Sequence, residues 1–267
     1  MSLPTIAMFW DGPPLSFIER LCIASFLEIG HPVEVFSYSG LDNLPKGAKA
    51  VSAEEILPNP ASIIRHERTG SAAIHADKFR YHLLTKRPGI IWADTDIYCL
   101  KPFQPENGYL FGLENDKVIC NAVMALPATS PTLSDLVTFC EDEYAIPVWM
   151  MPRHRQEMRD RAEAGNPMHV SEMPWGAWGP KALTHYLHNN DEFRHRQEEH
   201  VLYPVPYEDR RLFCRPAART WKRVKEDTVS LHFYGRRLRA HLDNSYDGIP
   251  PEGSLLAELG EKHGIQP

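Results

Sequence analysis

The chain has 267 residues, of which 43% are hydrophobic and 10% are aromatic. This composition is typical of a folded globular protein and excludes the disordered and fibrous classes. A formal net charge of −6 argues against a general nucleic-acid-binding protein. Residues 210–239 differ from the rest, because they hold ten Lys or Arg and only two acids. This basic stretch is either a solvated face or a surface that meets phosphate or another anionic partner.

The cysteine pattern and the N-terminal sequence indicate a reduced, cytoplasmic protein. No C-x-x-C pair is present, so neither a disulfide framework nor a zinc ribbon is indicated. The N-terminus lacks a basic segment followed by an apolar run, and no stretch reaches the roughly 18 apolar residues of a membrane span. We therefore expect buried, reduced thiols at all five cysteines, which are Cys22, Cys99, Cys120, Cys140 and Cys214.

Strand-like and helix-like segments alternate in the first half of the chain. Pro14 is suited to a helix start, and Ala76, Phe79 and Leu83 form a core stripe at helical spacing. Such alternation implies an α/β layered domain, and a short, wholly apolar strand is expected at the centre of a mostly parallel sheet. The expected strands are Thr5–Trp10, Pro32–Tyr38 and Gly89–Ala93, and the expected helices are 15–30 and 72–86.

The periodic signal is weaker after residue 125, where prolines are frequent. We expect a second half rich in loops and helices, within a single domain. Its expected elements are helices at Pro131–Glu143, Arg153–Ala164, Gly179–Asn190 and Gly253–His263, and a strand at Thr228–Tyr234.

Two aspartates follow the apolar strand that ends at Ala93. Alternate residues of an extended chain share a face, so we expect Asp94 and Asp96 to converge on one point. The carboxyl ends of strands are where α/β folds place their ligands, and two carboxylates suit Mg²⁺ or Mn²⁺ bridging a diphosphate. The alternative is a solvated turn.

Other acidic sites fit this segment less well. A calcium loop beginning at Asp94 needs Gly at its sixth position and Glu at its twelfth, where Cys99 and Pro105 stand. A phosphatase of the D-x-D type prefers a small residue at the place of Tyr98. A nucleotide-sugar transferase is the better match.

A charged pair precedes this strand in the sequence. Asp77 and Arg80 are three residues apart and therefore neighbours on one helix face. Arg80 is suited to a sugar or phosphate and Asp77 to a sugar hydroxyl. A surface ion pair explains the same two residues.

The central segments resemble a known enzyme family. Ala76–Tyr81, followed by Gly89–Asp96, resembles the D-x-x-R…D-x-D region of glycosyltransferase family 32. The order of similar segments matches from residue 5 to about residue 256. The other segments that are similar to bacterial members are Phe9–Leu15, Asn121–Met124, Gly179–Thr184, and the strand of His232 followed by Gly253–Leu256.

The resemblance implies a retaining, metal-dependent glycosyltransferase of hexosyltransferase type with a GT-A, Rossmann-like fold. Residues 1–267 would form one such domain, with a nucleotide-sugar-binding half at 1–125. Residues 126–267 would form the acceptor-side half and a closing C-terminal segment. The donor would be a nucleoside-diphosphate sugar, with UDP-sugar favoured, and the acceptor a glycan or glycolipid hydroxyl. Mn²⁺ or Mg²⁺ would be the cofactor.

The resemblance also assigns roles to individual residues. Trp10 would stack on the donor base, although a core aromatic at a strand end is an equal alternative. Asp77, Arg80, Asp94 and Thr95 would contact the donor. The metal ligands would be Asp96, Asp94 and His232, and the catalytic residues would be Asp94, Asp96 and Arg80.

The acceptor side has its own candidates. Aromatic faces and amides suit sugar rings, although core packing explains them equally well. The candidates are Asn121, Trp175, Trp178 and Gly179. The sequence departs from the family at Phe233–Gly235, where Leu-Trp is usual after the late His, and at Trp178, where a small polar residue is usual. The sugar and the acceptor therefore stay open.

Further expectations concern charge and rival functions. Arg236, Arg237 or Arg239 would add positive charge from the closing segment, unless they belong to a solvated basic face. The basic residues 210–239 would suit peripheral contact with the inner face of a membrane. Two rivals stay open: a non-catalytic protein that binds a nucleotide sugar or glycan, and a D-x-D phosphohydrolase.

Overall fold

The computed structural model describes residues 2–58 and 63–267 and divides the chain into two compact units. Unit 1 comprises Met1–Ser52, Gly89–Ala125 and Arg196–Pro267, and unit 2 comprises Ala53–Pro88 and Leu126–His195. These segments are not the halves 1–125 and 126–267 expected from the sequence. The single-domain assignment stays a prediction.

Unit 1 is built around a six-stranded sheet with the order β3-β2-β1-β4-β7-β6. Strands β3, β2, β1 and β4 pair in parallel, and β7 pairs antiparallel with both β4 and β6. The expected α/β fold class with a central mixed, mostly parallel sheet is confirmed. The strands are β1 (Ile6–Phe9), β2 (Val33–Ser37), β3 (Lys49–Ser52), β4 (Ile91–Ala93), β6 (Leu110–Asn115) and β7 (Val118–Ala125).

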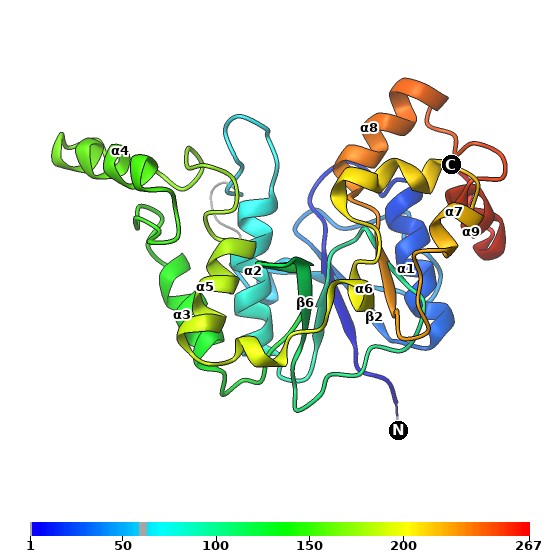
Figure 1. Cartoon of the computed structure of the whole chain (residues 1–267), viewed down its shortest axis with the longest axis horizontal. Coiled ribbons are helices and arrows are strands. Elements are labelled where there is room, and N and C mark those ends of the chain that lie inside the picture. The colour runs from blue at the N-terminus through cyan, green and yellow to red at the C-terminus, as the bar shows by residue number, and fades with distance from the viewer. Residues whose placement is uncertain (1, 59–62) are drawn as a thin grey trace. The chain divides into compact units, whose positions relative to one another are not determined.

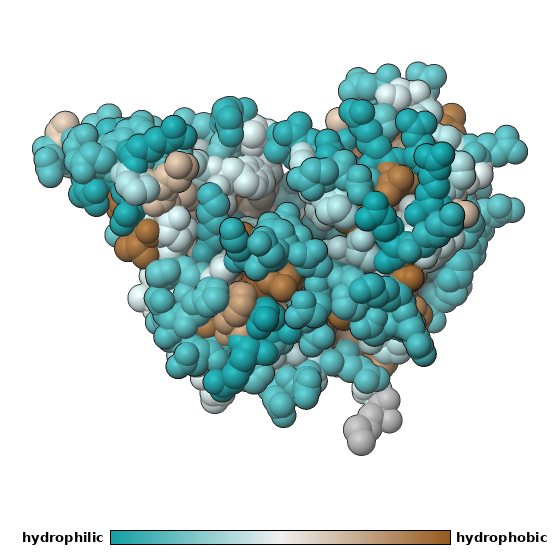
Figure 2. Space-filling view, viewed as in Figure 1, coloured by the Kyte–Doolittle hydropathy of each residue, from teal (hydrophilic) through white to brown (hydrophobic). Residues whose placement is uncertain are grey.

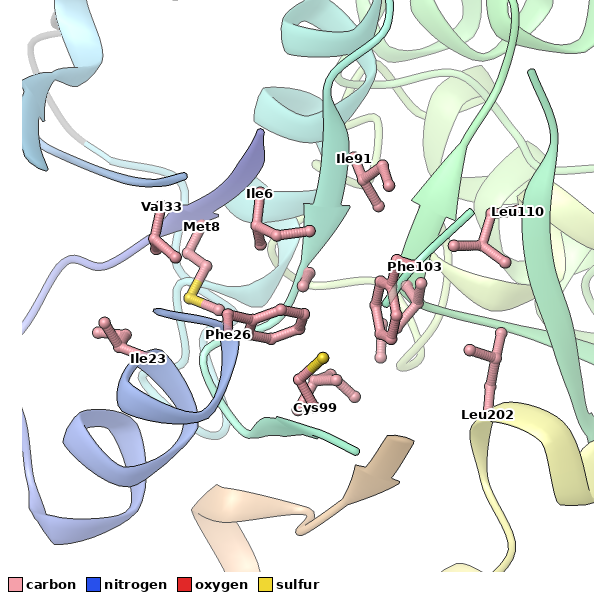
Figure 3. Packing of buried hydrophobic residues seen from close by; sticks show 14 of the residues in the cluster. Ile6, Met8, Ile23, Phe26, Val33, Ile91, Cys99, Phe103, Leu110 and Leu202 are labelled. Atoms are coloured by element: carbon pink, nitrogen blue, oxygen red, sulfur yellow. The ribbon is translucent and has the colours of Figure 1, made fainter. Parts of the chain in front are cut away.

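The strands next to the sheet centre are buried because helix α1 (Phe17–Ile29) packs beside the sheet. Figure 3 shows side chains of β1, β2 and β4 converging with those of α1. Phe26 of α1 meets Phe103 edge to face, with ring centroids 5.1 Å apart. This apolar layer fixes the positions of the strand ends, where the candidate site lies.

Helix α1 begins at Phe17, because Ser16 caps it. Ser16 and Glu19 form a capping box, and Gly30 ends the helix with φ of 99°. Pro14 therefore lies before the helix, and the expectation that it starts the helix is wrong.

Unit 1 also contains a second, two-stranded sheet. β5 (Ile97–Cys99) pairs antiparallel with β8 (Ser230–His232), which is shorter than the strand expected at Thr228–Tyr234. Figure 1 shows α9 beside α1, in agreement with the apolar cluster that they share. The remaining elements are α6 (Glu199–Leu202), the 3₁₀ helix Tyr207–Cys214, α7 (Ala218–Trp221), α8 (Gly235–Tyr246) and α9 (Leu255–His263).

Unit 2 is mainly helical. Phe79 and Leu83 of α2 are fully buried as expected, whereas Ala76 is half-buried, so it is wrongly included in the core stripe. In α4 only Met158 is buried, and Figure 1 shows this helix lying apart from α2, α3 and α5. The elements are the 3₁₀ helices Ala53–Glu55 and Phe193–His195, and α2 (Ala73–Lys86), α3 (Pro131–Cys140), α4 (Pro152–Glu163) and α5 (Pro180–Asn189).

Burial and surface character agree with the composition. All five cysteines are free and buried, as expected. The face drawn in Figure 2 is predominantly hydrophilic, with apolar residues exposed in scattered places. Within the described ranges, no helix combines the length and the apolar character needed to cross a membrane.

Candidate active site

The acidic pair lies in a tight turn that joins β4 to β5. Ile97 donates its backbone N–H to the carbonyl of Asp94 over 3.1 Å, which closes a four-residue turn. The extended arrangement expected for Asp94 and Asp96 is therefore wrong. Asp94 accepts a hydrogen bond from the indole of Trp92 over 2.8 Å, whereas Asp96 has partners from β8 and α8.

Asp96 is held by residues that lie far away in the sequence. Its backbone carbonyl accepts from Phe233 N–H over 2.9 Å, next to the Ile97–His232 pair of the small sheet. Its Oδ2 accepts from the backbone N–H of Gly235 over 2.6 Å, at the first residue of α8. The carboxylate thus lies at a helix N-terminus, where the helix dipole favours negative charge.

The second oxygen of Asp96 is buried beside an imidazole. Oδ1 lies 3.5 Å from His232 Nε2 and makes no hydrogen bond with any residue in the described ranges. Burial by itself would raise the pKa of Asp96, but the charge of His232, the Gly235 N–H and Arg239 outweigh it and lower the pKa to about 2. Burial opposes the protonated form of His232, yet the charge of Asp96 raises the pKa of His232 well above its usual value.

His232 is fixed by two aromatic side chains. Its ring lies 4.0 Å from that of Tyr234 and 5.7 Å from that of Tyr203, measured between centroids. Tyr234 has a φ of 53° and so turns the chain from β8 into α8. This packing places the imidazole beside the carboxylate of Asp96.

Trp10 and Arg239 are two further candidate site residues of unit 1. Trp10 follows β1, its backbone N–H donates to Phe36 O over 2.9 Å, and its indole donates to Pro13 O over 2.7 Å. The guanidinium of Arg239 lies 5.6 Å from the centroid of the Trp10 ring and forms an ion pair with Glu19. Because Glu19 is fully buried, burial raises its pKa, which Arg239 and the bonds to Ser16 partly offset.

Asp96 and His232 have side chains of the types that a hard divalent cation can take as ligands. Asp96 offers a buried oxygen that makes no hydrogen bond, and a neutral His232 offers Nε2. Mg²⁺ commonly takes one or two protein carboxylates and completes its shell with water and phosphate oxygens. Among the residues that the structure describes, no three His, Cys, Asp or Glu side chains form a metal-binding group. A role of Asp94 as a third ligand stays a prediction.

Two further predicted residues lie in unit 1. Asp94 donates its backbone N–H to Ala122 O over 2.7 Å, which places Asn121 of β7 at the level of the turn. Thr95 is the second residue of the turn, and both Thr95 and Asn121 are buried. The structure thus groups Trp10, Asp94, Thr95, Asp96, Asn121 and His232 in one unit.

The other predicted residues lie in unit 2. Asp77 and Arg80 form the expected i,i+3 pair, with 3.2 Å between Oδ1 and Nη2, and both are buried. Burial distinguishes this pair from an exposed helix-surface ion pair, which contributes little to stability.

The predicted acceptor residues of unit 2 differ sharply in exposure. Trp178 is fully buried, and its carbonyl accepts from Tyr81 Oη over 2.6 Å. Gly179 is the residue before the first turn of α5. Trp175 is 45% exposed. Acceptor contacts by these residues stay predictions.

Sequence reasoning missed two members of the candidate site, Glu19 and Gly235. Gly235 contacts Asp96 closely, because a Cβ there would lie 3.0 Å from Asp96 Cβ and 3.0 Å from Arg239 Nη1. The Ser16-x-x-Glu19 spacing is visible in the sequence as a capping box. It gives no sign that Glu19 also pairs with Arg239, 220 residues away.

Comparisons with known proteins show a distant likeness to solved structures. No protein-family model matches the chain, and no curated protein matches it. Among solved structures, the PaToxG glycosyltransferase is similar with a TM-score of 0.43 and 14% identity. The likeness covers 70% of this chain and 69% of that one.

Proposed function

We propose that this chain is a glycosyltransferase that moves a sugar from a nucleoside-diphosphate sugar to a hydroxyl acceptor with the help of Mn²⁺ or Mg²⁺. The observation that carries the proposal is the buried Oδ1 of Asp96. It makes no hydrogen bond with a described residue and lies beside His232 at the end of β4. His232 at 3.5 Å offsets the charge of this buried oxygen without a hydrogen bond, so the oxygen keeps lone pairs with which it can bind a cation.

The candidate site residues of unit 1 have separate roles in this proposal. The exposed part of the Trp10 ring stacks on the donor base, and Arg239 offers positive charge to the diphosphate. Asp96 and His232 hold the metal, with Asp94 as the further expected ligand. When bound, the metal neutralises the charge that develops on the leaving diphosphate.

Metal binding has a consequence for His232. Asp96 raises the pKa of His232 well above its usual value and so favours the protonated imidazole in the absence of metal. Only the neutral imidazole ligates a metal, so loading the site releases a proton. Gly235 N–H keeps the carboxylate of Asp96 oriented in both states.

The finer assignments follow the family resemblance. Asp77 and Arg80 contact the donor sugar, and Thr95 contacts the donor. A UDP-sugar is the favoured donor, a glycan or glycolipid the acceptor, and transfer proceeds with retention. No carboxylate is assigned as a covalent nucleophile, so we favour attack on the same face through an ion-pair-like transition state.

The test measures thermal unfolding with a panel of nucleoside diphosphates and nucleotide sugars, with and without Mn²⁺. A ligand at about 100 times its Kd stabilises a protein by roughly 2.7 kcal/mol. We expect a manganese-dependent rise in Tm with one nucleotide family. Asp96→Asn should abolish this rise and the transfer activity. Asp227→Asn is the matched control, because Asp227 is an exposed aspartate of unit 1 that pairs with His200.

The outcomes separate the proposal from its rivals. Release of nucleoside diphosphate on addition of acceptor supports a transferase. Binding of the donor without release identifies a binding protein, and release of inorganic phosphate identifies a phosphohydrolase. Full activity of Asp96→Asn would contradict the metal assignment.

Contact with a membrane surface is a separate part of the proposal. The basic stretch 210–239 includes the end of the 3₁₀ helix Tyr207–Cys214, α7 and the start of α8. Its exposed cations are Arg211, Arg215, Arg219, Lys222, Arg223, Lys225, Arg236 and Arg237. Association with anionic vesicles that weakens as salt rises is the expected result.

A further inference from the structure

Unit 2 contains a cavity of 770 Å³ whose walls come from three segments. Residues 66–68 form one wall, α4 forms the second, and residues 168–175 form the third. This volume lies within the range of about 300–1,000 Å³ that is usual for small-molecule sites. The cavity is formed wholly by residues of unit 2.

An exposed tryptophan lies at this cavity. Trp175 is 45% exposed and meets the ring of His66 edge to face, with centroids 5.5 Å apart. His66 itself is buried and its Nδ1 lies 3.3 Å from Thr69 Oγ1. The Trp175 ring therefore has a fixed support on one side and solvent access on another, which suits a planar binding surface.

Hydrogen bonds tie two of the walls together. Glu67 donates its backbone N–H to Ser171 O over 3.0 Å, and Ser171 Oγ donates to Glu67 Oε1 over 3.3 Å. His169 anchors the same loop, because its Nδ1 lies 2.8 Å from Ser171 Oγ and its Nε2 lies 2.9 Å from Glu143 Oε2. These bonds fix the relative position of the walls before a ligand arrives, which reduces the entropy cost of binding.

The charges around the cavity are close to balanced. Arg161 of α4 and Glu172 form an ion pair of 2.7 Å, which neutralises both. The other acidic and basic lining residues are Glu67, Glu157 and Arg68, so the lining has one more acid than it has Lys or Arg. A strongly anionic ligand is disfavoured here, whereas an uncharged ligand rich in hydroxyl groups finds carboxylate acceptors beside an aromatic face.

We propose that this cavity binds an uncharged glycan, with one sugar ring against Trp175 and its hydroxyls on Glu67 and Glu157. The apolar C–H face of a sugar ring matches the indole, and its hydroxyl edge matches the carboxylates. This inference rests on the proposed function, since it names the acceptor class as neutral glycan. It assigns the recognition of that acceptor to α4 and its facing loops.

The test measures binding of the full chain to a glycan array in the absence of donor and metal. We expect binding to neutral oligosaccharides that exceeds binding to their sialylated or uronic-acid-bearing counterparts at least tenfold. Trp175→Ala should lower this binding at least tenfold, and Glu157→Gln should lower it by a smaller factor.

Tyr144→Ala provides the matched control. Tyr144 is an exposed aromatic of unit 2 that also packs edge to face on a histidine, His169, and it does not line the cavity. The Tyr144→Ala variant should bind glycans as strongly as the parent chain does. Equal losses in Trp175→Ala and Tyr144→Ala, preference for acidic glycans or for peptides, or no binding on the array would each overturn the proposal.

Asp96→Asn separates this inference from the proposed function. That variant should lose the manganese-dependent donor effect and keep glycan binding. Trp175→Ala should keep the donor effect and lose glycan binding. If only Asp96→Asn departs from its expected result, the metal assignment is wrong. If only Trp175→Ala departs from its expected result, the glycan cavity is wrong.

Discussion

Gly235 donates its backbone N–H to Asp96 Oδ2 over 2.6 Å, so one carboxylate both occupies the candidate metal site and caps helix α8. The two residues are 139 positions apart in the sequence. This bond couples the turn after β4 to the segment that carries Arg239. We therefore expect a change at the start of α8 to affect the position of Asp96.

Replacing Gly235 with alanine tests this coupling. The new Cβ would lie 3.0 Å from Asp96 Cβ and 3.0 Å from Arg239 Nη1, so the carboxylate or α8 has to move. Such overpacking typically costs about 1–3 kcal/mol. We expect Gly235→Ala to unfold at a lower urea concentration and to lose the manganese-dependent donor effect. Arg237→Ala, an exposed change in the same helix, should change stability by less than about 0.5 kcal/mol.

The ion pair of Glu19 with Arg239 joins the starts of α1 and α8. Glu19 is fully buried, so removing its partner leaves a buried charge, which typically costs about 3–5 kcal/mol. We expect Arg239→Met to lower the free energy of unfolding by about 3 kcal/mol, since the side chain of Arg239 is partly exposed. The Glu19→Gln/Arg239→Met double variant should be more stable than Arg239→Met. Additive effects in urea unfolding would show that the two residues are not coupled.

The Trp10 side chain tests the base-stacking role. Stacking of a base on an aromatic side chain contributes about 1–3 kcal/mol. Trp10→Ala should therefore weaken nucleoside-diphosphate binding by about tenfold or more, and Trp10→Phe should weaken it less. Isothermal titration of the preferred nucleotide in the presence of Mn²⁺ measures this. Unchanged affinity of Trp10→Ala, with an unchanged Tm, would assign Trp10 to packing alone.

The environment of His31 indicates that the stability of the folded chain falls at acid pH. Its Nδ1 lies 2.8 Å from Pro4 O and its Nε2 accepts from Phe103 N–H over 2.9 Å, so the neutral ring satisfies both contacts. Burial lowers the pKa of His31, more than the bond to Pro4 raises it. The folded chain then binds the proton less well than the unfolded chain. The stability from His31 is complete above about pH 6.5 and is lost as the pH falls toward the lowered folded value.

The measurement is urea unfolding between pH 5 and pH 8. Stability should fall below about pH 6.5 in the parent chain, and this slope should be smaller in His31→Gln. The comparison of slopes, rather than of absolute stability, separates protonation from lost packing. Identical slopes would contradict the assignment.

Local patterns accounted for five elements in the first half of the fold. Strands β1, β2 and β4 and helices α1 and α2 lie within two residues of their expected bounds, because apolar runs and helical spacing are properties of the local sequence. Strands β3, β5, β6 and β7 were missed, although β6 and β7 are largely buried. Their burial arises from packing in the sheet rather than from an alternating pattern.

The sequence named Asp96 and His232 as candidate site residues, but it did not specify how they lie relative to each other. Asp96 and His232 are neighbours because β5 and β8 pair in a register that sets Ile97 opposite His232. The turn at Asp94 orients its side chain to Trp92 instead of along an extended strand. Both features depend on hydrogen bonds that no residue spacing specifies.

The sequence by itself determined the α/β class, the buried reduced cysteines and the acidic residues at the end of β4. These depend on composition and on periodicities of two and 3.6 residues, which are properties of the local sequence. Only the tertiary structure decided that Gly235, His232 and the Glu19–Arg239 pair gather around Asp96, and that Trp178 is buried while Trp175 lines a cavity. Contacts between residues more than one hundred positions apart follow from the packing of the whole unit, and a single sequence carries no local signal for them.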